Sequence, residues 1–105
     1  MKTSGSGKYK VTLEEKPIGE DLLLILSGGD KPHAGVVVMA EPNQETKVLV
    51  SGTHKEELVA RPIAEKKSNE TGKRVVCVSG VHVDNATKEE IEILVKNCKE
   101  LEEQL

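Results

Sequence analysis

The sequence predicts a single α+β domain, in which a mostly antiparallel sheet of about five strands carries two helices on one face. Short apolar runs bounded by Gly and Pro are typical of strands, and two stretches with apolar residues three or four positions apart are typical of helices. The chain has 105 residues, which is enough for one hydrophobic core. We expect the order ββββαβα over residues 1–105, with residues 1–7 as a flexible N-terminal arm.

The first four predicted strands come before any helix. Residues 8–14 alternate between apolar and polar side chains, as expected for a half-buried or edge strand. A turn containing Pro17 and Gly19 then leads to a second strand at residues 21–26. Further strands are expected at residues 35–40 and, after a polar turn, at residues 46–50. The simplest arrangement of these strands is an antiparallel meander.

Two of these strands contain continuous apolar runs, at residues 22–26 and 36–40, on either side of a polar, Gly-rich segment. Such runs fit strands that are buried on both faces, although periodicity alone also allows a buried helix. Two helices can cover only one face of the sheet. We therefore expect a second copy of the chain to cover the other face, giving a homodimer through a sheet face or strand edge. The rival interpretations are that the first strand and the N-terminal arm fold across that face, or that the short apolar runs are partly exposed.

The first helix is expected to begin near Thr53, where residues 53–56 have the form of a capping box, and to end at Gly72. Pro62 lies inside its apolar pattern and predicts a kink or a break near Ala60. A fifth strand is predicted at residues 73–79, and a second capping box begins at Thr87. The apolar stripe of this second helix consists of Ile91, Leu94, Val95, Cys98, Leu101 and Leu105.

Composition disfavours several classes of function. The net charge is -3 and Tyr9 is the one aromatic residue, so neither a polyanion-binding field nor a base-stacking platform is expected. No apolar run approaches the length of a membrane span, and residues 1–10 lack the apolar core of a signal peptide. We expect a cytoplasmic protein that binds neither nucleic acid nor membrane. Cys77 and Cys98 lie in apolar patterns and are interpreted as buried, reduced thiols.

A Ser-Gly pair precedes each of the three histidines, and in a meander all three segments reach the same edge of the sheet. Both helices are expected to begin at that edge, where free backbone amides and a lysine would suit an anion or phosphate. The candidate binding residues at this rim are Gly28, Gly29, Lys31, His33, Gly52, Thr53, His54, Gly80 and His82.

The residues leave a plainer interpretation open, in which the glycines only permit tight turns and the histidines are surface or capping residues. A three-histidine metal site is disfavoured, because the histidines lie on different strands and Asp84 is the one nearby carboxylate. No serine sits in a nucleophile elbow, no Walker loop is present, and no acid and base pair can be placed. We therefore expect no catalytic residues and no resident metal.

Three segments, at residues 27–35, 52–62 and 80–91, resemble in order and spacing the LpdD-type prenylated-flavin chaperone-like family. The resemblance implies a fold similar to that of the proteasome-assembly-chaperone domains. It also implies a non-catalytic accessory protein that binds or delivers prenylated flavin mononucleotide (FMN), or FMN itself, to a UbiD-type decarboxylase of hydroxyaryl acids. The family supplies no catalytic residues, so His33, His54 and His82 are rim residues by position only.

Two other functions compete with this one. The first is a protein-assembly chaperone of the proteasome-assembly-chaperone type, which would act through its dimer surface without a small ligand. The C-terminal residues 102–105 lack the hydrophobic-Tyr-X ending of archaeal proteasome-binding tails, and this disfavours that role. The second is a small enzyme with an unrecognised site, which the shortage of acid, base and nucleophile constellations makes the weakest hypothesis.

Overall fold

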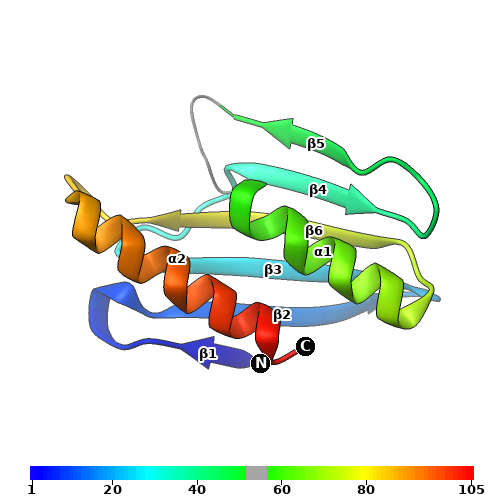
Figure 1. The fold of residues 1–105 in the computed structure, drawn as a ribbon, viewed down its shortest axis with the longest axis horizontal. Coiled ribbons are helices and arrows are strands. Elements are labelled where there is room, and N and C mark those ends of the chain that lie inside the picture. Colours follow the sequence, from blue (N-terminus) through cyan, green and yellow to red (C-terminus); the bar gives the residue numbers. More distant parts are fainter. Residues whose placement is uncertain (52–56) are drawn as a thin grey trace.

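The computed structural model describes residues 1–51 and 57–105, and within them it shows a six-stranded mixed sheet with two α-helices. Both helices lie on the same face of the sheet, as Figure 1 shows. This confirms the predicted α+β class. In chain order the elements are β1 (Lys2–Ser4), the 3-10 helix η1 (Gly7–Tyr9), β2 (Val11–Ile18), β3 (Asp21–Gly29), β4 (Val36–Ala40), β5 (Lys47–Val50), α1 (Glu57–Thr71), β6 (Val75–His82) and α2 (Lys88–Glu103).

The strand order is β1-β2-β3-β6-β4-β5, so the predicted meander is wrong at its centre. The strands β3 and β4 do not pair with each other, because β6 lies between them, parallel to β3 and antiparallel to β4. β6 has nearly continuous apolar side chains over residues 75–78, which suit the middle of a sheet. The connection at residues 30–35 is long enough to pass the end of β6 and leave room for that strand.

The N-terminal region contains more strand than the sequence predicts. Lys2–Ser4, inside the stretch expected to be an arm, forms β1 and pairs antiparallel with β2. β2 begins three residues later than the predicted first strand and continues through Pro17 as far as Ile18. The proline is tolerated because β1 pairs only with residues 11–13, so β2 is an edge strand at Pro17. Gly19, with a φ of 59°, then forms the turn into β3.

The helix α1 runs without a break from Glu57 to Thr71, so of the kink or break expected near Ala60 the break does not occur. Pro62 lies near the start of the helix, where its missing N–H removes one hydrogen bond, to the carbonyl of the exposed Leu58. The predicted start near Thr53 lies outside the described residues. Gly72 ends the helix as expected: its φ is 71° and its N–H donates to the carbonyl of Ser68.

The two helices bury one face of the sheet. α1 lies over β4 and β6, and α2 lies over β1, β2 and η1. Alternate residues of each central strand point into this layer and are almost fully buried, as in the series Leu22, Leu24 and Leu26 of β3. The core is completed by Val11, Leu13, Val36, Val38, Ala40, Val75, Cys77 and Val83, with Val59, Ala60, Ile63 and Ala64 from α1 and Leu94, Cys98 and Leu101 from α2.

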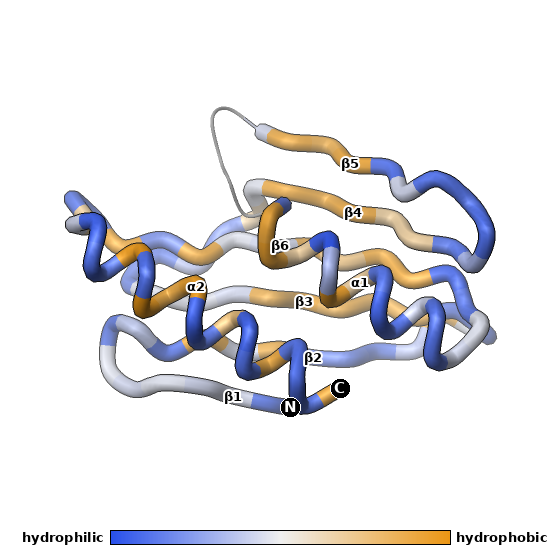
Figure 2. Tube along the Cα trace, viewed as in Figure 1, coloured by the Kyte–Doolittle hydropathy of each residue, from blue (hydrophilic) through white to orange (hydrophobic). Residues whose placement is uncertain are grey.

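The opposite face of the sheet, here called the open face, carries no helix. The strand register aligns its central side chains in one continuous apolar patch: Leu23 and Ile25 of β3, Val76 and Val78 of β6, Val37 and Met39 of β4, and Leu49 of β5. Figure 2 shows mainly hydrophobic residues along the central parts of β3 to β6, and alternating hydrophilic and hydrophobic residues along the two helices. The continuous apolar runs predicted that both faces of the central strands are buried. In the described residues the helices cover one face and leave the open face uncovered.

Candidate functional site

Three strands end at the same edge of the sheet, as the sequence analysis expected. β3 and β6 are parallel, and β5 is antiparallel to β4 and therefore points in the same direction as β6. The connection between β3 and β4 crosses the end of β6 at this edge. Its amides donate to β6 carbonyls: Asp30 N to His82 O at 2.8 Å and Gly35 N to Ser79 O at 2.9 Å. This crossing brings residues 30–35 next to residues 79–82.

The crossing needs glycines because backbone passes very close to backbone. A Cβ on Gly80 would lie 1.6 Å from the carbonyl oxygen of His33, and one on Gly29 would lie 2.2 Å from that of His82. Gly29 also has a φ of 79°, which disfavours other residues. A Cβ on Gly28 would lie 2.4 Å from the carbonyl oxygen of Lys10. Gly29 and Gly80 therefore permit the crossing, whereas Gly28 permits the close approach of β3 to Lys10.

Four polar side chains meet at the crossing. Lys31 Nζ lies 2.7 Å from Asp84 Oδ2, and His82 Nε2 lies 3.0 Å from Asp84 Oδ1. The rings of His33 and His82 meet edge to face with their centroids 6.0 Å apart. Hydrogen bonds from Lys31 and then from His82 lower the pKa of Asp84, and the same carboxylate raises the pKa of Lys31. We call Lys31, His33, His82 and Asp84 the rim cluster.

The rim cluster borders the open face. In β6 the residues Cys77, Ser79 and Val81 alternate toward the helix layer, so His82 points to the other side of the sheet. His33 lies on that side as well, because its backbone occupies the space that a Gly80 side chain would take. The apolar patch of the open face therefore ends, at this edge, in two imidazoles and a lysine.

Two amides at the start of α2 are bonded within the chain. Thr87 and Glu90 form the predicted capping box, with Glu90 N donating to Thr87 Oγ1 at 3.1 Å and Thr87 N donating to Glu90 Oε1 at 3.0 Å. Tyr9 Oη donates to Glu90 Oε2 at 2.9 Å, and Lys8 Nζ lies 2.9 Å from the same oxygen. These contacts lower the pKa of Glu90 to about 2. The ionised Glu90 carboxylate therefore lies at the positive end of this helix and complements its dipole.

The candidate rim residues Gly52, Thr53 and His54 lie outside the described residues, so their places relative to the rim cluster stay a prediction. Tyr9 is held at the start of α2 by Glu90, on the helix side of the sheet. At the rim cluster the described chain therefore offers imidazole, ammonium and aliphatic groups, and no Phe, Tyr or Trp ring on which a flavin could stack.

A family model describing the prenylated flavin chaperone LpdD-like domain matches residues 5–105. The chain belongs to this family. A search of curated proteins found no match. The LpdD-like match confirms the resemblance seen in three separate segments of the sequence, and extends it to essentially the whole chain. The family is described as a chaperone for prenylated flavin, which connects this LpdD-like chain with a flavin and favours a non-catalytic role.

Both cysteines of this LpdD-like domain lie in its core. Cys77 and Cys98 are both buried, and burial raises the pKa of Cys77 to about 12, so its thiolate is scarce at neutral pH. Within residues 1–51 and 57–105, no three His, Cys, Asp or Glu side chains are grouped in a way that could hold a metal ion. None of the described helices has the length and apolar character needed to cross a membrane.

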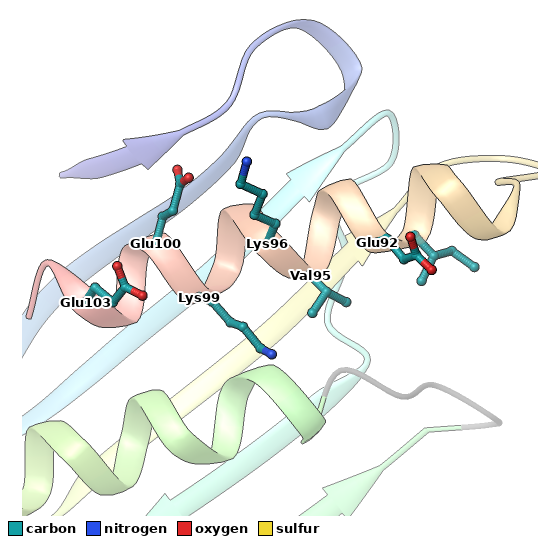
Figure 3. A pocket seen from close by; sticks show the side chains of 7 residues that line it. Glu92, Val95, Lys96, Lys99, Glu100 and Glu103 are labelled. Carbon is teal, nitrogen blue, oxygen red and sulfur yellow. The ribbon is translucent and has the colours of Figure 1, made fainter.

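One shallow hollow of about 580 Å³ lies away from the rim cluster, on α2. All its lining residues come from the exposed side of that one helix: Ile91, Glu92, Val95, Lys96, Lys99, Glu100 and Glu103. Figure 3 shows Lys96 and Glu100 extending to one side of the helix, and Val95 and Lys99 to the other. Its three glutamates and two lysines are interspersed on a single convex element, so this hollow cannot enclose a ligand.

Sequence reasoning missed two parts of the site. It considered Asp84 only as a possible metal ligand, whereas this residue binds both Lys31 and His82 and so organises the rim cluster. Asp84 follows His82 by two positions in the sequence, so their contact could have been foreseen. The contact of Lys31 with Asp84 depends on the crossing of residues 30–35 over the end of β6. It also treated the rim separately from the uncovered sheet face, and the structure shows that the two are continuous.

Proposed function

We propose that this protein is a non-catalytic accessory protein that binds prenylated FMN, or FMN, and delivers it to a UbiD-type decarboxylase of hydroxyaryl acids. The observation that carries the proposal is the position of the rim cluster at the end of an uncovered apolar sheet face, in a chain of a prenylated flavin chaperone family. We also propose that the protein works in the cytoplasm as a homodimer.

The rim cluster supplies groups that suit the phosphate of such a ligand. Lys31 is a charged donor and the His82 imidazole can also donate, and charge-assisted hydrogen bonds to phosphate are among the stronger polar contacts in proteins. Asp84 holds both side chains at the same edge of the sheet, while Lys31 remains mostly exposed and available. In this proposal His33 lies beside them, Gly28, Gly29 and Gly80 keep the backbones close enough to form the rim, and Gly52, Thr53 and His54 complete it.

The open face supplies what a prenylated ring system needs. The prenyl addition makes a flavin more apolar, and beyond Ser27 the side chains of the open face, among them Ile25 and Val78, are aliphatic. Binding sites for such ligands combine a largely apolar lining with a few polar groups that fix the orientation. The ring would therefore rest on branched aliphatic side chains, with its phosphate at the rim cluster.

Ligand titrations test this proposal. We expect prenylated FMN to raise the melting temperature in a concentration-dependent way and to change its fluorescence on binding. Lys31→Ala and His82→Ala should each weaken binding by roughly tenfold, as expected when a charge-assisted contact is lost. Lys96→Ala, which changes a lysine on the outer side of α2, is the matched control and should bind as well as the unmodified chain. An unchanged melting curve at saturating prenylated FMN and FMN would discard the cofactor role.

A second experiment addresses delivery. The loaded protein is mixed with a UbiD-type decarboxylase that lacks its cofactor, and decarboxylase activity is followed against a mixture that receives free prenylated FMN. Faster or more complete activation by the loaded protein is the expected result.

The exposed apolar patch also supports a second candidate function. In that function the protein assists the assembly of other proteins and needs no small ligand. That function predicts tight binding of a protein partner together with unchanged melting in the presence of either flavin. The titration and the delivery experiment therefore separate the two.

A further inference from the structure

The two edges of the sheet are protected to different degrees. The β1 edge is tied to α2, where Lys2 Nζ donates to Gln104 O at 2.7 Å and Ser4 Oγ donates to a Glu100 carboxylate oxygen. At the other edge, Figure 1 shows β5 with no further strand of the described chain beyond it, and α1 lies over β4 and β6 instead. Exposed edge strands offer backbone groups to another chain, and proteins usually cover or charge them. The outer side of β5 is therefore the place where this sheet can be extended.

The backbone of β5 presents hydrogen-bonding groups on that outer side. Ser51 N donates to Gly35 O at 2.8 Å, at the end of the ladder between β4 and β5. Hydrogen-bonded and non-hydrogen-bonded pairs alternate along an antiparallel ladder, so Leu49 turns its N–H and C=O toward β4. The N–H and C=O of Val48 and of Val50 therefore point away from β4, at the alternate positions that a neighbouring strand uses.

Two large apolar side chains near these groups are exposed. Val48 and Val50 pair with core residues of β4, so they point to the helix side of the sheet. Thr46 Oγ1 donates to Glu65 on the side of α1 that faces β5, and Leu58 lies about two turns before Glu65 on that same side. Val50 is 43% exposed and Leu58 is 72% exposed. We call the outward backbone of β5, with the side chains of Val50 and Leu58, the β5 edge.

Positive charge lies beside the start of β5. Lys47 is exposed and points to the open face, and no carboxylate of the described residues pairs with it. On the helix side, Arg61 Nε lies 3.5 Å from a Glu65 oxygen that also accepts the Thr46 hydroxyl. Opposite charges on neighbouring strands stabilise their pairing. A strand that carries a carboxylate near one end would therefore complement this end of β5.

We propose that the β5 edge receives an extended segment of a partner protein as one further strand of the sheet. The segment that fits has branched apolar residues at alternate positions, which would cover Val50 and Leu58, and an acidic residue that reaches Lys47. In this mode of recognition the main-chain hydrogen bonds supply affinity and the alternate side chains supply selectivity. The inference goes beyond the function proposed above and does not depend on a bound flavin.

A peptide titration tests the β5 edge. The probe is a short peptide in which valine alternates with threonine, with a glutamate at one end, and it is added to the isotopically labelled full chain. The amide signals of Val48 and Val50 should shift and saturate. Val50→Pro removes an outward N–H without removing a bond to β4, and it should weaken binding by roughly tenfold. Val50→Thr keeps that N–H and is its matched control.

A second pair of variants tests the apolar part of the β5 edge without changing β5. Leu58→Ala removes the exposed side chain on α1 and should weaken peptide binding by roughly threefold to tenfold. Ile91→Ala removes an exposed apolar side chain of α2 and should bind the peptide as the unmodified chain does. Melting temperatures of all four variants verify that weaker binding is not caused by unfolding, and Leu58→Ala decides if Val50→Pro does not fold.

The remaining outcomes overturn the inference. They include unchanged amide signals of Val48 and Val50 at millimolar peptide, and peptide binding that survives both Val50→Pro and Leu58→Ala. Equal binding of a peptide with proline at alternate positions would show that no strand is added. If sedimentation gives a smaller assembly for Val50→Pro than for the unmodified chain, the edge is occupied by a second copy, and the proposed partner is wrong.

Discussion

The two faces of the sheet are made from the same strands and nearly the same residue types, yet their surroundings are different. In β3, Leu24 is completely buried beneath the helices, whereas the adjacent Ile25 on the open face is only partly buried. β4 and β6 show the same alternation, with Val38 and Cys77 fully buried and their neighbours partly exposed. The central residues of these strands are all apolar, but buried and partly exposed residues alternate along them.

This difference shows that the open face is apolar for a reason that the isolated chain does not supply. A sheet with one solvated face commonly places polar residues there, as β2 does with Thr12, Glu14 and Lys16. The central strands depart from this rule and β2 obeys it, within one sheet. The departure is therefore confined to the patch that adjoins the rim cluster.

The largest expected effect comes from substituting adjacent residues on the two faces. Leu24→Ala should lower the free energy of unfolding by about 2–5 kcal/mol, because it leaves a cavity in the core. Ile25→Ala should cost about 1 kcal/mol in dilute solution, where its side chain is already partly hydrated. Urea unfolding at two protein concentrations measures both. A second copy on the open face should raise the cost of Ile25→Ala with concentration, and equal costs for the two variants in dilute solution would contradict the contrast.

The next effect concerns the place where chain crosses the open face. Gly80→Ala should lower the free energy of unfolding by about 1–3 kcal/mol, because its Cβ would overlap the His33 carbonyl and the crossing would have to shift. The two imidazoles should separate as well, which the NMR signals of His33 and His82 would report. Ser27→Ala, at the position paired with Gly80 on β3, is the control and should change stability by less than about 0.5 kcal/mol. A fully stable Gly80→Ala protein would show that the crossing is not tightly packed.

A smaller effect is expected on the helix face. Thr87→Ala removes the acceptor for Glu90 N at the start of α2 and should cost about 1 kcal/mol. Thr87→Ser keeps the hydroxyl and should retain most of the stability. Because α2 packs on the face opposite the rim cluster, neither substitution should alter flavin binding. Loss of binding in Thr87→Ala would mean that the two faces are coupled.

The smallest effect is a dependence of stability on pH. Lys8, the Thr87 backbone and Tyr9 hold the pKa of Glu90 at about 2 in the folded chain, below its usual value of 4.5. The stabilisation by the ionised carboxylate is therefore fully present above about pH 4.5, and it is lost as the pH falls toward 2. Melting temperatures measured across this range should decline less steeply for Glu90→Gln than for the unmodified chain. Parallel declines would contradict this role for Glu90.

Much of the fold could be predicted from local patterns. The capping box at Thr87, the glycine that ends α1 and the apolar runs of β3, β4 and β6 each act within a few residues, so the sequence displays them. The insertion of β6 between β3 and β4 depends on the pairing of distant segments, which no local pattern encodes. β1 was equally hidden, because Lys2–Ser4 has no apolar pattern and is a strand only through its pairing with β2.

The rim could be predicted in part for a related reason. Strand directions follow from the number of turns, and this was sufficient to bring His33 and His82 to one edge. The sides of the sheet on which they lie, and the contact of Asp84 with Lys31, depend on how the connection crosses β6. At the start of α2 the capping box bonds the amides of Thr87 and Glu90 within the chain, so a ligand there would not receive these two amides.

The central position of β6 has a consequence for the order of folding. Leu22 of β3 pairs with Val75 of β6, and Val38 of β4 pairs with Cys77 of β6. The half of the sheet that contains β3 is therefore joined to the half that contains β4 only after β6, the segment after α1, has been synthesised. Until then β3 and β4 expose backbone edges and apolar side chains on both sides, and closure requires contacts across most of the chain. A ribosome-bound fragment that ends within α1 should therefore need shielding from aggregation, so that this protein would itself be a client of general folding factors early in its life.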